Sequence, residues 1–420
     1  MTAPRTVRRA VTMSVASLGV FTLAACGGGG GFTSGSAPSQ NTKTAGGVKL
    51  TMMIGSSGPA ETKAVQDATA AWGKSSGNTV NVVAASNLDQ QLGQGFAGAN
   101  PPDVFYVDAS KIGTYAKAGY LFPYGDQLDK STFEDSLVQA FSYQGKFYCA
   151  PKDSSTLALQ INTDLWKAAG LTDKDYPTTW AQLETVAKKL TKGNVTGLVI
   201  GNDHNRGGAF MVQAGGWLQS GGKITATDPG NVKGLQEVQK LMQAGVLKYN
   251  TQTKPSTGWG GEALGKKVAA MTIEGNWIAG GMKDFPGVKY KTVELPAGPA
   301  GKGSLMFSNC WGIAAKSKNQ AAAVALVKQL ITPDQQMKFA ADFGVMPSTK
   351  QGLTQFEQKY PDQAAFVKAA AYAKPPINLP GLTQATTSFD SAIGAMTPQT
   401  DATKLLQAFQ KNADAAASGN

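Results

Sequence analysis

The sequence contains little cysteine and little histidine. It has three Cys and one His in 420 residues. Three Cys spread over this length make neither a disulfide framework nor a cysteine zinc cluster, and one His offers almost no basis for a His-based metal site or catalytic triad. We therefore expect no metal ion, no cofactor and no catalytic residues.

Arginine is also scarce. The formal net charge is +11, but only four of the 39 basic residues are Arg, and Arg5, Arg8 and Arg9 are three of them. Proteins that bind nucleic acid use Arg for bidentate contacts with bases and phosphates. A chain whose only later Arg is Arg206 is expected to bind no nucleic acid, and its dispersed Lys residues indicate a solvated basic surface.

The chain does contain enough apolar material for folded domains. Apolar residues make up 42% and charged residues 16% of the sequence, which excludes a disordered chain. With a prior of about 150 residues per domain, the length predicts two or three domains.

The N-terminus has the parts of an export signal. A cationic stretch (residues 1–10) is followed by an apolar stretch (11–25) that is too short for a comfortable membrane-spanning helix. Its end, Leu23-Ala24-Ala25-Cys26, resembles the lipobox of bacterial lipoproteins, in which the Cys thiol is lipidated and becomes the new N-terminus. We predict a lipoprotein signal peptide over residues 1–25; the alternative is an ordinary signal peptide with an incidental Cys.

The residues after Cys26 predict a flexible tether. Five Gly and then a tract of Ser, Thr, Gly, Pro and Gln extend to residue 47 and cannot form a core. Several acyl chains on one Cys would give stable anchoring. Residues 26–47 are thus expected to hold the protein at the outer face of the cell membrane.

From residue 48 the pattern alternates between strands and helices. Strands are expected over 48–54, 79–85 and 104–108, with helices over 60–76 and 87–98. This alternation predicts a parallel sheet with right-handed crossovers. Ligands bind beyond the carboxyl ends of such strands, which directs attention to Ser56, Ser57, Asn87 and Asp108.

A second α/β unit is expected to begin near residue 152. Buried strands are predicted over 156–162, 196–201 and 268–273, and a long strand over 305–315 that crosses between the units. Thr179 and Thr332 each have capping-box spacing before a helix, and Gly344 ends the second of these helices. Residues 201–208 read as a polar loop.

Several motifs resemble the extracellular solute-binding proteins of carbohydrate ABC transporters, of the maltose-binding-protein type. The resemblance covers about 48–416 and is carried by the order and spacing of Pro102-Asp103-Val104, Gly119-Tyr120-Leu121, the stretch 145–151 leading into 157–166, 269–275 with Trp277, Trp311-Gly312-Ile313, residues 316–319, Phe343-Gly344 and Pro347. It implies an α/β, periplasmic-binding-protein-like (type II) clamshell whose two lobes each have a mixed, mostly parallel sheet flanked by helices. Lobe one would comprise 48–150 plus 311–345, and lobe two 153–305 plus 350–416, with three hinge crossings.

Candidate ligand contacts follow from the resemblance and the predicted strand ends. Sugars are held by planar polar side chains and by aromatic faces, and the candidates are Ser56, Ser57, Glu61, Asn87, Asp108, Lys152, Asp153, Asp203, Arg206, Trp217, Glu274, Asn276, Trp277, Asn309 and Trp311. Several have a structural alternative: Trp277 and Trp311 could be core residues, Asn87 and Asp108 helix N-caps, Glu61 a first-turn compensation of the helix dipole, and the pair Lys152 and Asp153 a bridge between the lobes.

Cys149 and Cys310 both lie near predicted hinge crossings. Export permits oxidation, so we predict that they form a disulfide; the alternative is two free thiols.

The predicted function is that of a lipid-anchored subunit of an ABC importer that binds a carbohydrate between its lobes and delivers it to the permease membrane subunits. We expect a monomer without enzymatic activity, since ligand-driven lobe closure requires no chemistry. Two alternatives stay open. One is an extracellular glycoside hydrolase using a carboxylate pair among Asp103, Asp108, Asp153 and Glu274. The other is the same fold with a peptide, polyamine or metal as cargo.

Overall fold

The structure is a computed structural model that describes residues 46–418. The expected signal peptide, Cys26 and nearly all of the expected tether lie outside these residues. The described part contains two large sheets and two two-stranded hairpins, and the order of the strands shows how the chain passes between the large sheets.

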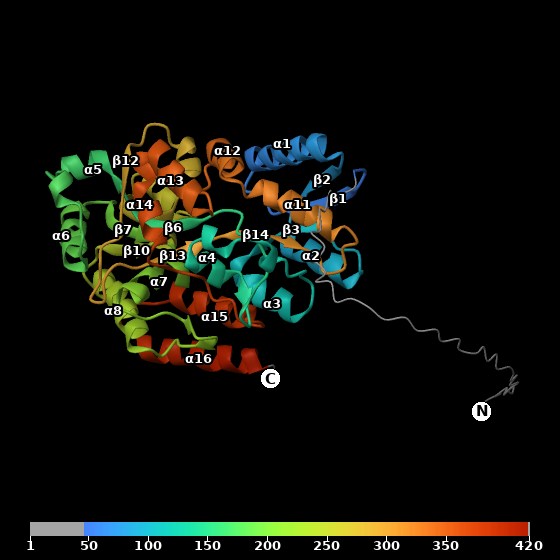
Figure 1. Ribbon diagram of the computed structural model, residues 1–420. Coiled ribbons are helices and arrows are strands. Elements are labelled where there is room, and N and C mark those ends of the chain that lie inside the picture. The colour runs from blue at the N-terminus through green and yellow to red at the C-terminus, as the bar shows by residue number, and fades with distance from the viewer. Residues whose placement is uncertain (1–45, 419–420) are drawn as a thin grey trace, which may run out of the picture. The chain divides into compact units, whose positions relative to one another are not determined.

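The first sheet has four strands in the order β14-β3-β1-β2 (Figure 1). Its members are β1 (Lys49–Ile54), β2 (Thr79–Ala84), β3 (Val104–Asp108) and β14 (Asn309–Ile313). Strand β1 pairs in parallel with β2 and β3, whereas β14 runs antiparallel to β3. All residues of β3 are buried except Asp108 at its carboxyl end.

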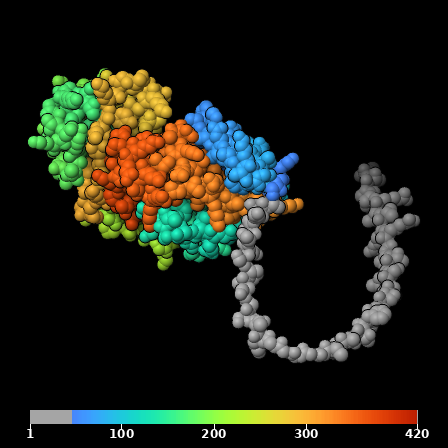
Figure 2. Space-filling model, turned by 45° about the horizontal axis from the view of Figure 1, so that its top comes forward, coloured from blue at the N-terminus to red at the C-terminus, as the bar shows by residue number. Residues whose placement is uncertain are grey.

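Helices that pack on or beside this sheet come from two separate stretches of the chain, 59–140 and 320–343. They are α1 (Pro59–Ser76), α2 (Leu88–Ala97), α3 (Ile112–Lys117), α4 (Asp135–Ala140), α11 (Gln320–Leu330) and α12 (Pro333–Phe343). Helix α1 starts with Pro59 and ends at Gly77, whose φ of 73° is a left-handed conformation that favours glycine. Figure 2 shows α11 and α12, in orange, beside α1, in blue.

The second sheet has seven strands, six of them in the order β10-β7-β11-β6-β13-β15, with β12 paired to β6. They are β6 (Ser155–Asn162), β7 (Thr196–Ile200), β10 (Leu247–Tyr249), β11 (Ala269–Gly275), β12 (Tyr290–Val293), β13 (Ser304–Phe307) and β15 (Ala373–Lys374). The pairs of β7 with β10 and β11, and of β13 with β15, are parallel; the three pairs of β6 are antiparallel. Both sheets are therefore mixed.

The remaining elements surround the second sheet or form short hairpins. The helices are α5 (Thr163–Ala168), α6 (Trp180–Leu190), α7 (His204–Gln213), α8 (Pro229–Gln243), α9 (Gly260–Gly265), α10 (Ile278–Gly281), α13 (Lys350–Lys359), α14 (Ala364–Ala370), α15 (Thr383–Gly394) and α16 (Ala402–Ser418). The hairpins are β4 (Ser142–Tyr143) with β5 (Lys146–Phe147), and β8 (Gln219–Ser220) with β9 (Lys223–Ile224).

Local sequence signals located most elements, with three differences. The strand expected over 305–315 breaks at Ser308 into β13 and β14, which lie in different sheets and so carry the chain from one to the other. Helix α12 begins after Thr332 and ends at Gly344 as expected, but Thr332 makes no side-chain capping hydrogen bond. The expected loop 201–208 was wrong beyond residue 203, because α7 begins at His204 with Asp203 as its cap.

Three segments connect the parts that contain the two sheets: 148–154, Ser308, and 344–349. Hydrogen bonds join them side by side. The Lys152 amide donates to the Asn309 carbonyl at 2.7 Å, and the Ser154 amide to the Met346 carbonyl at 2.9 Å. The Ser308 hydroxyl donates to the Asp153 carbonyl at 2.6 Å. The crossings thus form one hydrogen-bonded hinge region.

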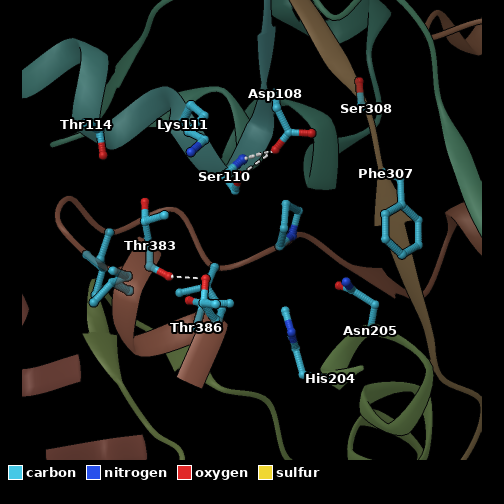
Figure 3. A pocket seen from close by; sticks show the side chains of 15 residues that line it. Asp108, Ser110, Lys111, Thr114, His204, Asn205, Phe307, Ser308, Thr383 and Thr386 are labelled. Atoms are coloured by element: carbon cyan, nitrogen blue, oxygen red, sulfur yellow. Dashed lines mark hydrogen bonds between the residues drawn. The ribbon is translucent and has the colours of Figure 1, made fainter. Parts of the chain in front are cut away.

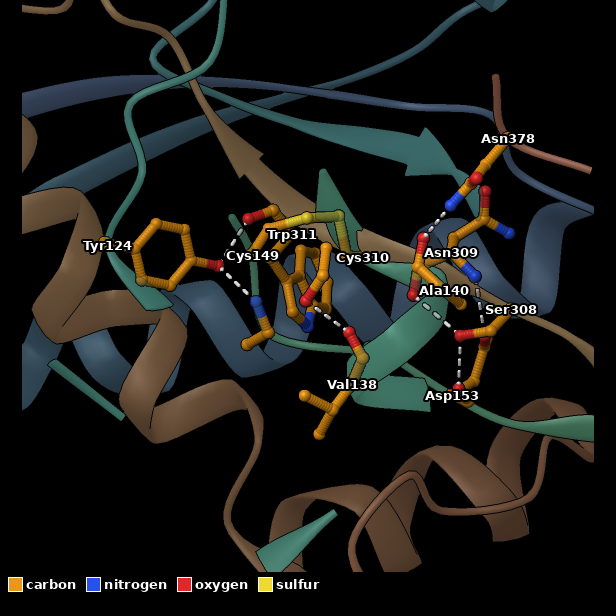
Figure 4. The surroundings of a disulfide bond; sticks show 12 residues. Tyr124, Val138, Ala140, Cys149, Asp153, Ser308, Asn309, Cys310, Trp311 and Asn378 are labelled. Carbon is orange, nitrogen blue, oxygen red and sulfur yellow. Dashed lines mark hydrogen bonds between the residues drawn. A yellow bond between two sulfur atoms is a disulfide. The ribbon is translucent and has the colours of Figure 1, made fainter. Parts of the chain in front are cut away.

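A disulfide joins Cys149 to Cys310 beside this hinge, with 5.7 Å between the Cα atoms (Figure 4). Both residues are buried in the core next to the first sheet. The Tyr124 hydroxyl donates to the Trp311 carbonyl at 2.5 Å and accepts from the Ala150 amide at 2.9 Å. One covalent bond and one tyrosine therefore hold the first two crossings together.

Candidate functional site

Side chains from both parts of the fold enclose a cavity of about 260 Å³ (Figure 3). From the part with the first sheet come Asp108, Ser110, Lys111 and Thr114, at and after the carboxyl end of β3; from the other part come His204, Asn205, Phe307 and the α15 residues Thr383, Thr386 and Thr387. The lining mixes hydroxyl, amide and charged groups with the Phe307 ring and with apolar side chains, among them Ile377, Leu379 and Leu382. This composition suits a ligand that carries both hydroxyl groups and apolar C–H faces.

Asp108 combines two of the roles that the sequence left open. Its carboxylate accepts from the Ser110 amide at 2.8 Å, capping the short 3-10 turn Ala109–Lys111, and it also lines the cavity. Asn309 lies directly opposite Asp108 across the β3–β14 pair. Asn87, in contrast, caps α2 by accepting from the Gln90 amide at 3.0 Å and does not line this cavity.

A half-exposed tryptophan lies at the end of β11. Trp277 is 37% exposed, and its Nε1 donates to Glu274 at 3.0 Å. Phe307, which lines the cavity, packs edge-on against it with 5.3 Å between ring centroids. Trp277 itself is not among the residues that line the cavity, and it meets the lining through Phe307. A partly exposed indole in this place is suited to stack against a ligand.

Behind Trp277 lies a buried ion pair. Arg206 Nη2 and Glu274 Oε2 are 2.7 Å apart, and the guanidinium lies 5.5 Å from the Trp277 ring. Burial lowers the pKa of Arg206, but the charges of Glu274 and Asp203 outweigh burial and raise it overall. Asp203 also caps α7 through the Asn205 and Arg206 amides. The pair therefore orients Trp277 and leaves little net charge beneath it.

A second buried ion cluster lies at the hinge. Glu61 accepts from Lys152 Nζ and from the Tyr106 hydroxyl, each at 3.0 Å, and from the Ser57 amide and hydroxyl, each at 2.7 Å. Burial raises the pKa of the Glu61 carboxyl, but Lys152 and Ser57 outweigh burial and hold it below its ordinary value. Asp153, on the other side of Lys152, accepts from the Asn309 amide at 3.1 Å.

Lys152 is enclosed by aromatic rings as well as carboxylates. Its Nζ lies 4.5 Å from the ring centroid of Tyr106 and 5.3 Å from that of Phe343. Burial lowers the pKa of Lys152, but Asp153, Tyr106 and Glu61 more than compensate and raise it above its usual range. The charge of Lys152 is thus paired with those of Glu61 and Asp153 within the hinge.

The structure places other predicted contacts away from the cavity. The prediction for Trp311 was wrong, because its side chain is fully buried in the first core. Trp217 is 6% exposed, donates to the Pro375 carbonyl and lines a different cavity of about 850 Å³. Asn276 is buried and bonded to Gly344 and Ser155. The Ser56 hydroxyl donates to the Gly58 carbonyl and accepts from the Thr62 hydroxyl.

Sequence reasoning missed several cavity residues. Phe307 lies in the stretch 305–315, for which only a strand was expected, and Lys111 lies just after the expected strand 104–108. Thr383, Thr386 and Thr387 carry a signal that could have been used, because spacings of three and four place them on one face of α15.

Residues 46–418 have two further properties that concern metal ions and membranes. They contain no group of three or more His, Cys, Asp or Glu side chains arranged to hold a metal ion. Within the same range, no helix has the length and apolar character needed to cross a bilayer.

Residues 63–368 match the family of bacterial extracellular solute-binding proteins. The chain belongs to this family. Solute-binding proteins similar to it include a probable ABC transporter-binding protein of Deinococcus radiodurans, which is 27% identical over 66% of this chain and 71% of its own. The maltodextrin-binding protein MdxE of Bacillus subtilis is 25% identical over 74% of this chain and 78% of its own.

Solved structures show the same fold. The cyclic alpha-maltosyl-1,6-maltose binding protein from Arthrobacter globiformis has a TM-score of 0.77 at 19% identity, covering 89% of this chain and 100% of that one. UgpB from Mycobacterium tuberculosis, in complex with glycerophosphocholine, has a TM-score of 0.75 at 17% identity, covering 89% and 99%. The periplasmic-binding-protein-like (type II) α/β fold predicted for this solute-binding protein is confirmed.

Proposed function

We propose that this solute-binding protein binds an oligosaccharide in the cavity beside Trp277 and delivers it to the membrane subunits of an ABC importer. The observation that carries the proposal is the placement of a half-exposed Trp277 next to a cavity lined from both parts of the fold. A ligand that contacts both sides of a hinge stabilises the closed conformation, because both sets of contacts form only when the two parts approach. Lobe one would be 48–150 plus 311–345, and lobe two 153–305 plus 350–416.

Relatives support an oligosaccharide over other cargo. The names of similar proteins include a maltodextrin-binding protein, a diacetylchitobiose-binding protein and an arabinooligosaccharide-binding protein. The charges near Trp277 and in the hinge are paired within the protein, which favours a neutral ligand over an anionic or cationic one.

In this proposal the protein binds and releases its ligand without catalysing a reaction. Of the four carboxylates considered for a hydrolase, Glu274 is paired with Arg206 and Asp153 with Lys152, while Asp103 accepts from Thr51 and Ser317. Only Asp108 lines the cavity. A glycosidase needs two carboxyl groups flanking the bond that is cleaved, so this arrangement favours binding without hydrolysis.

We also propose that Cys26 is lipidated and that the protein acts as a monomer tethered to the outer face of the membrane. A lipoprotein of Streptococcus pneumoniae that binds maltooligosaccharide is 26% identical over 73% of this chain. Mass spectrometry of the membrane-extracted protein would detect a diacylglyceryl group on an N-terminal Cys26. An unmodified Cys26 would contradict the anchor without affecting the binding site.

A thermal-shift panel tests the cargo. Maltose, maltotetraose, diacetylchitobiose, an arabinooligosaccharide and glycerophosphocholine are each added to purified protein. A ligand at a hundred times its Kd stabilises the folded protein by about 2.7 kcal/mol. We expect at least one oligosaccharide to raise the Tm, with no product sugar after prolonged incubation. A shift with glycerophosphocholine alone would overturn the sugar assignment, and released product would favour a hydrolase.

A further inference from the structure

The single histidine of the chain lies in the wall of the cavity. His204 is the first residue of α7 and lines the cavity on the side opposite Asp108, Ser110 and Lys111 (Figure 3). Its side chain is only 8% exposed, and His204 was not among the ligand contacts expected from the sequence.

Asp390 on α15 sets the orientation of the imidazole. One carboxylate oxygen, Oδ1, lies 2.7 Å from the His204 backbone nitrogen and 2.7 Å from Nδ1 of the ring. A carboxylate only accepts hydrogen bonds, so the neutral ring carries its proton on Nδ1. Nε2 then has a free lone pair.

No hydrogen bond to Nε2 is made by any of residues 46–418, yet this atom is not among the buried polar atoms that lack a partner. Nε2 is therefore accessible, and the accessible space next to His204 is the cavity. A polar atom fixed in direction and left without a protein partner is suited to receive a hydrogen bond from a ligand.

We propose that His204 is a ligand contact whose Nε2 accepts a hydroxyl hydrogen bond, and that Asp390 positions it. A ligand hydroxyl that donates to this lone pair gains a hydrogen bond in a fixed direction.

Charged groups around His204 define its electrostatic setting. Asp390 contacts it from α15, Asp203 and Arg206 are neighbours on α7, and Asp108 and Lys111 line the cavity from the other part of the fold. Arg206 is paired with Glu274, and Lys111 lies 3.2 Å from Asp89. Asp390 is thus the charged group that bonds the ring directly.

Two substitutions separate the two ring nitrogens. His204→Asn keeps a donor at the Nδ1 position for Asp390 but removes the atom that faces the cavity. His204→Gln keeps a polar atom at the Nε2 position. We expect His204→Asn to weaken binding about tenfold at pH 7.5, the effect of one lost hydrogen bond, and His204→Gln to retain most of the affinity.

The inference rests on the proposed function, and calorimetry with maltotetraose as the probe distinguishes the two. Wild type and His204→Gln should bind maltotetraose with similar affinity, and His204→Asn about tenfold more weakly. Equal affinity of wild type and His204→Asn, with unchanged Tm values, would overturn the role of His204 while leaving the proposed function intact. Absence of binding by maltotetraose and by every other glycan of the panel would overturn both.

A readout without ligand tests the positioning role of Asp390. Because the chain has one His, protein with nitrogen-15 histidine and no histidine tag gives one imidazole spin system in long-range proton–nitrogen NMR spectra. We expect the Nδ1–H tautomer at pH 8 in wild type and a mixture of tautomers in Asp390→Asn, whose amide can accept or donate. An Nε2–H tautomer in wild type would contradict the acceptor role, whatever the cargo.

Discussion

Glu61 and Lys152 form a buried ion pair that joins the start of α1 to the first hinge crossing. Glu61 Oε1 and Lys152 Nζ lie 3.0 Å apart, and the two side chains are 4% and 3% exposed. The sequence placed both residues among the ligand contacts. Their partners, Ser57, Tyr106 and Asp153, instead make them part of a network that holds the hinge to the first sheet.

Breaking this pair should destabilise the protein strongly. Lys152→Met leaves the Glu61 carboxylate buried without its cation, and we expect the free energy of unfolding to fall by about 3–5 kcal/mol, measured by urea denaturation. A matched control lies on the same helix: Lys63 and Asp67 form an exposed pair, and Lys63→Met should change stability by less than about 1 kcal/mol. Equal effects of the two substitutions would contradict the buried network.

The network also predicts how stability depends on pH. The pKa of Glu61 is lower in the folded protein than its ordinary value of 4.5, so its contribution is present above about pH 4.5 and is lost as pH falls further. The pKa of Lys152 is raised above its ordinary value of 10.5, so its contribution is present below that pH and is lost as pH rises through the folded pKa. Urea denaturation between pH 6 and 3 should show a smaller loss in Glu61→Gln than in wild type; identical slopes would argue against this assignment.

Substitution of Trp311 should mainly lower stability, whereas substitution of Trp277 should mainly abolish ligand binding. Trp311→Ala removes a fully buried ring and should cost about 3–5 kcal/mol of stability. Trp277→Ala removes a ring that is 37% exposed but contacts Phe307 and Arg206, so it should cost less stability than Trp311→Ala while abolishing the ligand-induced shift. Tyr120→Ala, at another exposed aromatic residue that does not line the cavity, controls for loss of surface area. A Trp277 variant that still binds normally would exclude the stacking platform.

The disulfide leads to expectations for the alkylation of the two cysteines and for the free energy of unfolding. Alkylation of the unreduced, denatured protein should modify neither Cys149 nor Cys310, and reduction should expose both. The double variant Cys149→Ser, Cys310→Ser should unfold with a free energy lower by about 2–5 kcal/mol, since the bond closes a long loop in the unfolded chain. Thr69→Ser, at a buried site that keeps its hydroxyl, provides a comparison with a small effect. Two alkylated thiols before reduction would contradict the bond.

Much of the local structure was predictable because its signals are local. Pro59 and Gly77 bound α1, Thr179 caps α6, and the alternation of apolar runs with amphipathic helices indicates an α/β fold. The capping contact predicted for Thr332 failed although the helix begins there, because Pro333 and the following residues suffice to start α12 without it.

The site was less predictable because it depends on which strand ends meet. Asp108 and Trp277 follow strands that the pattern identifies, and both lie at or beside the cavity. Trp311 has the same residue type and an equally suggestive position near the hinge, but its direction on β14 sends the ring into the core. Side chains alternate between the faces of a strand, so one register position decides between ligand and core.

The sequence by itself determined the α/β alternation, the helix limits set by Pro and Gly, and the shortage of His and Cys that argues against metal chemistry, because each depends on residue type and short-range spacing. Only the tertiary structure decided that Glu61 pairs with Lys152 and that His204 meets Asp390. These partners are 91 and 186 residues apart in the chain. The order of strands in the sheets and the hinge crossings bring them together, and the spacing of residues along the sequence does not determine that order.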